Sequence, residues 1–196
     1  MRSATPPRRP RRRQQRPVLC FGKEPCDEVQ ASALALMGAS ITFEWHEGVT
    51  HVIAKSLRRS QRLMCAVCRG QSLVTPAWVL ESLRMQRWLD EAGYLPPGEG
   101  CAELGKALVR ARCKPLLAGL KVHLAPGLRG SVRHAAASVV CAAGGELLAK
   151  PQESGVVIDV ADGAGHNAAC DQQRYSVELL FEGAMSQELH WASHHL

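Results

Sequence analysis

The sequence predicts an α/β protein built from two similar repeats, each a four-stranded parallel sheet flanked by helices and packed in tandem. Two observations carry this prediction. Short apolar runs of strand length alternate with segments whose apolar residues recur at helical spacing, which is typical of a parallel sheet covered by helices. The same order begins again in the second half, and two helix-ending glycines, Gly38 and Gly144, lie about a hundred residues apart.

The first repeat is expected over residues 17–95. Its strands are short β-branched or apolar runs, at residues 17–22, 41–43, 52–54 and 73–74. Its helices show apolar residues at i, i+3 or i+4, over residues 26–37, 58–69 and 77–88. Either Ser56 or Ser60 is a good N-cap for the second helix, and Thr75 followed by proline starts the third. We expect this third helix to bury Trp78 and Met85.

A break at residues 95–100 and a short helix over 102–112 form an expected linker, residues 96–117. The second repeat is expected over residues 118–196. Its strands are predicted at residues 120–125, 147–148 and 155–162, and its helices at residues 131–145 and 176–189. Residues 161–174 are polar and rich in glycine and asparagine, so the element that matches the second helix of the first repeat is poorly marked.

The net charge of +6 has one source. Residues 1–17 contain seven arginines and no acidic residue, whereas the remaining 17 basic residues nearly balance the 18 acidic ones. Such a segment buries little apolar surface, so we expect residues 1–16 to be a disordered basic tail. The tail suits a nuclear localisation signal or a weak nucleic-acid contact, and a solubilising or linker segment is an equal alternative.

Several classes of function lack support in the sequence. No run approaches the roughly 18 apolar residues of a membrane helix. Eight cysteines without a secretory signal indicate free thiols in a reducing compartment. Cys65 and Cys68 form a C-x-x-C inside a predicted helix, without a second ligand pair, so we interpret them as buried small side chains. No catalytic or metal-ligating constellation is present, and we expect neither an enzyme nor a cofactor.

The segment from residue 50 to residue 70 carries the strongest chemical signal. A buried strand is followed by a helix whose predicted face carries Arg58, Arg62 and Arg69. A helix N-terminus favours anions, and guanidinium groups bind phosphate or carboxylate in a forked geometry. From composition alone, a solvated basic face is the more common outcome for such a pattern.

The order of elements and three motifs resemble the BRCT repeat. The motifs are THVIA at residues 50–54, RRSQRLMCAVCRG at 58–70 and AWVLESL at 77–83. Two copies joined by a short linker resemble the tandem BRCT modules of DNA-damage mediator proteins, of the microcephalin and mediator of DNA damage checkpoint type. The resemblance is weaker in the second copy, where Leu179 stands in the place of the usual tryptophan.

The resemblance implies an adaptor that binds phosphoserine or phosphothreonine peptides in the nucleus, in DNA repair and checkpoint signalling. In this family a Ser/Thr hydroxyl, a glycine N–H and a lysine hold the phosphate. Gly22 keeps the glycine place, Ser60 stands near the helix start and Arg62 takes the lysine place. Phe21 falls on the hydroxyl place and cannot donate a hydrogen bond; Lys23 or Arg58 is a possible substitute.

The family's second pocket accepts the peptide residue three places after the phosphorylated one, in the cleft between the repeats. The positions that match it here are Arg59, Met64, Ala125, Pro126, Glu178 and Phe181. Ordinary packing between the repeats is the alternative role for Met64 and Phe181. For the whole chain, the alternative to phosphopeptide binding is a BRCT scaffold that binds protein partners or DNA ends without phosphate. Phe21 favours this alternative, because it cannot supply the hydroxyl that holds the phosphate.

Overall fold

The computed structural model describes residues 16–150, 157–161 and 174–196, and it contains two parallel four-stranded sheets. The first sheet has the order β2-β1-β3-β4 and the second the order β6-β5-β7-β8. The first comprises β1 (Val18–Cys20), β2 (Ser40–Thr42), β3 (His51–Ile53) and β4 (Ser72–Val74). The second comprises β5 (Lys121–Leu124), β6 (Glu146–Leu148), β7 (Val157–Ala161) and β8 (Arg174–Ser176). The predicted α/β class with two parallel sheets is therefore confirmed.

Helices cover both faces of the first sheet. Those between its strands are α1 (Glu28–Leu36) and α2 (Gln61–Cys68), and α3 (Pro76–Arg84) follows its last strand. The short helix η1 (Ala92–Tyr94) leads to the linker helix α4 (Cys101–Cys113), and the second sheet carries α5 (Gly130–Ala142), α6 (Glu178–Ser186) and η2 (Trp191–Ser193). Among the described residues, no helix has the length and apolar character needed to cross a membrane.

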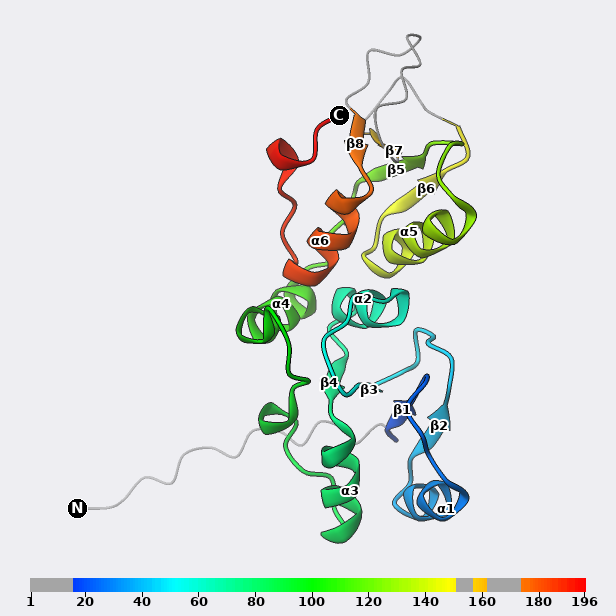
Figure 1. The fold of residues 1–196 in the computed structure, drawn as a ribbon, viewed down its shortest axis with the longest axis vertical. Coiled ribbons are helices and arrows are strands. Elements are labelled where there is room, and N and C mark those ends of the chain that lie inside the picture. Colours follow the sequence, from blue (N-terminus) through cyan, green and yellow to red (C-terminus); the bar gives the residue numbers. More distant parts are fainter. Residues whose placement is uncertain (1–15, 151–156, 162–173) are drawn as a thin grey trace, which may run out of the picture.

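The two repeats lie one above the other along the long axis of the molecule, with α2 between the sheets (Figure 1). On the side of the second repeat, α2 packs against α5 and α6, and α4 lies beside them. Helices α1 and α3 lie at the far end of the first repeat (Figure 1). The interface between the repeats is thus formed by the second helix of the first repeat and the helices α5 and α6 of the second.

Helix α2 belongs to two hydrophobic cores at once. Leu63, Ala66 and Val67 pack with the first sheet. Met64 and Cys65 pack with the core of the second repeat, and so does Cys68. An eight-residue helix has two opposite faces, and here both are apolar because both are covered. The C-x-x-C motif is therefore part of the buried packing, as we interpreted it from the sequence.

Two local expectations were wrong. Helix α2 begins at Gln61 with Ser60 as its N-cap, so Arg58 lies in the loop before it and does not share a helical face with Arg62. Met85 is 54% exposed because α3 ends at Arg84 and Met85 is only its C-cap. Cys141 is exposed on α5. The polar stretch 162–173 and the tail 1–15 lie outside the described residues.

Candidate phosphopeptide-binding site

The predicted anion-binding residues meet where β1 ends and α2 begins. The chain leaves β1 through Gly22, whose φ of +58° is strained for any residue with a side chain. Ser60 caps α2, and its hydroxyl oxygen accepts the backbone N–H of Leu63 at 3.3 Å. We call the recess formed by Gly22, Ser60 and Arg62 the notch.

The side chain of Arg62 lies directly over Gly22. A Cβ atom built on Gly22 would fall 0.8 Å from Nη1 and 2.1 Å from Cζ of Arg62. The absence of a side chain at Gly22 is therefore what allows the guanidinium to reach the end of β1. The Nε of Arg62 is buried and has no hydrogen-bond partner within the described part of the chain. This arrangement holds a cation beside a backbone N–H at a helix N-terminus, where anions are favoured.

Cys20 lies beneath the guanidinium of Arg62. Burial raises the pKa of the Cys20 thiol, although Arg62 and the N–H of Gly22 act in the opposite direction. The thiol is therefore neutral at physiological pH and does not neutralise the arginine. No carboxylate of the described residues forms an ion pair with Arg62, so its charge is available to a ligand.

Phe21 points away from the notch. It is only 1% exposed and packs in the core of the first repeat with Leu34 and Trp78. The ring therefore neither fills the notch nor supplies the hydroxyl that the family pattern has at this place. Lys23 and Arg58 are both exposed on the two loops beside the notch.

A groove of about 310 Å³ runs between the repeats beside the notch. Arg59, Met64 and Phe181 line it, and these are three of the residues expected in the second pocket. At its mouth, Nη1 of Arg59 donates to Oε2 of Glu178 at 2.7 Å, which joins the two repeats. Both side chains are more than a third exposed, so water screens this pair and its contribution to stability is at most about 1 kcal/mol.

The structure places Ala125 and Pro126 elsewhere. Ala125 is buried and its carbonyl accepts a hydrogen bond from Arg133, while Pro126 is exposed; neither lines the groove. Helix α5 supplies that wall instead, with Ser131, Val132 and Ala135. Helical spacing predicted a helix over these residues, but no signal in the sequence indicated that part of its surface borders the groove.

One polar contact across the interface was also missed. Nε2 of Gln61 donates to Oγ of Ser138 at 2.7 Å, which fixes the first turn of α2 against α5. Gln61 lies between the two arginines that we associate with ligand binding. The contact therefore holds the start of α2 in place between the notch and the groove.

The thiols of the C-x-x-C are poor metal ligands in this setting. Burial raises the pKa of Cys65 to about 12 and that of Cys68 to about 11. Metal binding requires the thiolate, which such values disfavour. Among the described residues, no group of three or more His, Cys, Asp or Glu side chains is arranged to hold a metal ion.

Comparison with known families agrees with this architecture. Residues 17–83 match the BRCA1 C Terminus (BRCT) domain. The BRCT5-BRCT6 domains of Brc1 from S. pombe superpose with a TM-score of 0.68 at 21% identity, covering 90% of this chain and 95% of that one. The chain has a tandem BRCT fold. The tandem arrangement also matches Rtt107p, solved in complex with a phosphorylated histone, with a TM-score of 0.67 at 12% identity over 93% of this chain and 94% of that one.

Full-length relatives are much longer than this tandem BRCT chain. PAX-interacting protein 1 from Mus musculus is 30% identical over 139 residues, which are 68% of this chain and 13% of that protein. SMC5-SMC6 complex localization factor protein 1 from Homo sapiens is 31% identical over 71 residues, 35% of this chain and 7% of that protein. The chain thus spans about one seventh or less of the curated relatives that it matches.

Proposed function

We propose that this tandem BRCT chain is a non-catalytic adaptor that binds phosphoserine or phosphothreonine peptides in the DNA damage response and repair, and that it acts in the nucleus. One observation carries the proposal: Arg62 is held over Gly22 at the start of α2, next to a groove that both repeats line. The complex of Rtt107p with a phosphorylated histone supports it, since that protein has the same tandem fold. That this chain is a module of the microcephalin or mediator of DNA damage checkpoint type stays a prediction.

The chemistry follows from the charge of the ligand. A phosphorylated serine carries nearly two negative charges at neutral pH and three strong acceptor oxygens. In the proposed complex the guanidinium of Arg62 and the N–H of Gly22 donate to two of them, and the N-terminus of α2 adds its dipole. The peptide then runs into the groove, where Arg59 contacts its backbone and Met64 and Phe181 contact an apolar side chain three residues after the phosphate.

Phe21 sets the expected strength of binding. A hydrogen bond to a charged group is worth about 1.5–3 kcal/mol, so the missing hydroxyl lowers affinity tenfold or more relative to a tandem BRCT module that has it. Lys23 and Arg58, exposed on the neighbouring loops, offset part of this loss by their charge. We therefore expect binding that depends on phosphate and weakens strongly with salt.

Fluorescence anisotropy with labelled pSer-x-x-aromatic peptides tests the proposal. We expect the phosphorylated peptides to bind and the unphosphorylated ones not to. Arg62→Glu should abolish binding because it reverses the charge in the notch, and Arg62→Lys should retain part of it. Arg87→Glu, the same charge change at an exposed position after α3, is the matched control and should bind like the wild type. Equal binding of both peptide forms would rule out phosphate recognition.

The second candidate function is a BRCT scaffold that binds protein partners or DNA ends without phosphate. The observation in its favour is Phe21, because its buried ring leaves the notch one donor short of the family pattern. A partner whose binding survives Arg62→Glu would support this function.

A further inference from the structure

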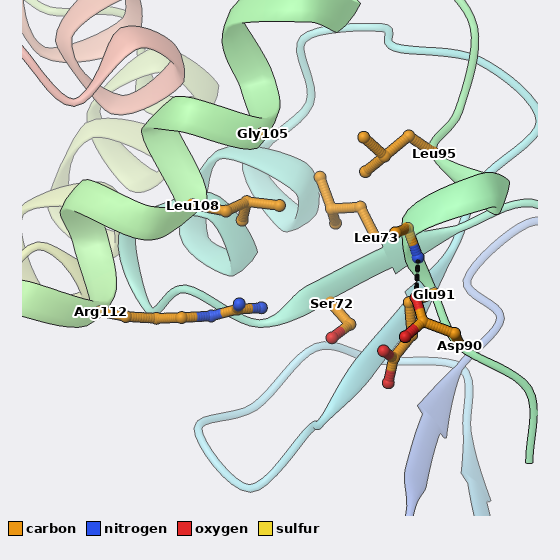
Figure 2. A pocket seen from close by; sticks show the side chains of 9 residues that line it. Ser72, Leu73, Asp90, Glu91, Leu95, Gly105, Leu108 and Arg112 are labelled. Carbon is orange, nitrogen blue, oxygen red and sulfur yellow. Dashed lines mark hydrogen bonds between the residues drawn. The ribbon is translucent and has the colours of Figure 1, made fainter. Parts of the chain in front are cut away.

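A second pocket lies near the other end of α2, next to the edge strand β4 (Figure 2). Its volume is about 330 Å³, and its walls come from β4, the segment around η1 and the linker helix α4. Leu73, Leu95 and Leu108 form its apolar surface. Ser72 begins β4 and Ser60 precedes α2, so an eight-residue helix of about 12 Å separates this pocket from the notch.

The two ends of this β4–α4 pocket differ in charge. Asp90 and Glu91 lie at one end and Arg112 reaches in from α4 at the other (Figure 2). Arg112 is already engaged, because its Nε donates to the carbonyl of Gly70 at 2.8 Å. One oxygen of Asp90 accepts the N–H of Ala92 at 2.9 Å, which leaves its second oxygen for a ligand.

Glu91 stays charged in this position. Its Oε1 lies 3.1 Å from Nε2 of His51, and this hydrogen bond, the largest influence, lowers the pKa of Glu91 below its ordinary value. With Asp90 beside it, the pocket carries a pair of carboxylates next to a leucine-lined wall. Such a site complements an arginine or lysine side chain, whose stem is apolar and whose head is cationic.

A chain of hydrogen-bonding contacts leads from this acidic end to the start of the folded chain. The N–H of Val18, the first residue of β1, donates to Oγ1 of Thr50 at 2.9 Å. That oxygen lies 2.8 Å from Nδ1 of His51, whose other ring nitrogen meets Glu91. The residues that precede Val18 therefore enter the fold close to the carboxylates, because only the side chains of Thr50 and His51 lie between Val18 and Glu91.

We propose that the basic segment preceding β1 binds the β4–α4 pocket through Arg11, Arg12 and Arg13. Arg13 is five residues before Val18, so an extended chain spans up to about 17 Å between them, enough to pass Thr50 and His51. An arginine stem lies against the leucines and its guanidinium meets Asp90 and Glu91. The site and the ligand thus belong to one chain, and the proposal does not depend on phosphopeptide binding.

This contact makes the basic tail a reversible ligand of its own domain. Exposed ion pairs weaken as salt shortens the Debye length, so the tail is released at high ionic strength. A polyanion such as a nucleic acid competes for the same arginines. The pocket therefore controls how much of the tail's charge is available to other partners.

NMR of the full chain tests the proposal through the backbone amides of Ala92, Leu95, Gly105 and Leu108. Replacing Arg11, Arg12 and Arg13 by Gln is expected to shift these amides and to remove their dependence on salt. Replacing Arg2, Arg8 and Arg9 by Gln removes the same charge farther from β1 and is expected to leave them near their wild-type positions. Asp90→Asn with Glu91→Gln, which keeps the hydrogen-bonding groups, should reproduce the shifts of the first variant.

Three results would overturn the proposal. The first is an unchanged spectrum of the pocket amides in the Arg11–Arg13 variant. The second is equal shifts in both tail variants, which would indicate a non-specific charge effect. The third is a pocket that responds only to an added arginine-rich peptide, since it would then be a site for a separate partner.

Discussion

At the scale of single residues, the notch depends on one glycine. Gly22 is needed for two independent reasons: its φ is positive, and the guanidinium of Arg62 occupies the space of a side chain. Ser60 contributes by capping α2, which fixes where the helix begins. The pairing of Gly22 with Arg62 therefore ties the end of β1 to the first turn of α2.

Gly22→Ala should weaken phosphopeptide binding by at least tenfold, since the new methyl group pushes Arg62 out of the notch. The left-handed backbone adds a stability cost of about 1–2 kcal/mol. Anisotropy and urea unfolding measure the two effects separately. Gly38→Ala is the control, because Gly38 also has a positive φ but nothing within 4 Å of its Cβ position. It should lose similar stability and bind normally; a normal affinity in Gly22→Ala would contradict this account.

The resemblance to the BRCT repeat implied that Gly22, Ser60 and Arg62 belong to one site. It did not reveal the contact between Arg62 and Gly22, since side-chain conformation depends on packing. The choice between Ser56 and Ser60 as N-cap stayed open for a similar reason. Both residues suit the role, and the tertiary position of α2 selects Ser60.

At the scale of elements, α2 is the helix on which both repeats rely. Its six residues from Leu63 to Cys68 are all buried. Hydrophobic periodicity predicted the helix and one apolar face. The opposite face carries two cysteines and one methionine, and the sequence favoured burial of the cysteines because their C-x-x-C has no second ligand pair.

The buried thiols of α2 give a direct test of this packing. With pKa values of about 12 for Cys65 and about 11 for Cys68, both are protonated at pH 8 and shielded from reagents. We expect iodoacetamide to modify the exposed Cys113 and Cys141 of the native protein, and to reach Cys65 and Cys68 only after unfolding. Mass spectrometry of the labelled peptides measures this order. Early labelling of Cys68 would show that α2 is not covered by the second repeat.

The limits of α3 show where element prediction failed. Helical spacing favoured a helix that continues beyond Arg84, which would place Met85 on its buried side. The helix ends there instead, and Gln86 has a positive φ of 49°. The chain then turns so that Trp88 stacks on Trp78 at 5.4 Å. Because Gln86 is not a glycine, nothing in the sequence indicated a turn with a positive φ at this position.

At the scale of the whole molecule, polar contacts outside α2 also hold the repeats together. Arg59 and Glu178 join them beside the groove. The linker helix α4 contacts both: Arg112 donates to Gly70 of the first repeat, and Arg110 donates to the carbonyl of Ser186 at 2.5 Å. The tandem order was predictable from the repeated pattern, and the family resemblance placed Arg59 and Glu178 in one cleft. The contacts of α4 were not predictable, because they depend on the relative orientation of the repeats.

Because the two cores share α2, we expect the repeats to unfold in one transition. Leu180→Ala removes a fully buried side chain from the core of the second repeat and should cost about 2–5 kcal/mol. Native-state hydrogen exchange should then show a similar loss of protection at Val122 in β5 and at Val52 in β3. Leu80→Ala, at an exposed position on α3, should leave both unchanged. Unaltered protection at Val52 in Leu180→Ala would show that the repeats unfold independently.

The double burial of α2 also bears on how this protein tolerates sequence variation. Most helices have a solvent-facing side on which substitutions accumulate without harm, but the stretch from Leu63 to Cys68 has none. In a saturation mutagenesis library selected for soluble expression, these six positions should form the longest uninterrupted block of intolerance in any described helix. A missense variant there would damage both halves of the protein, whereas one at Val29 or Leu36 on the open side of α1 would be almost silent.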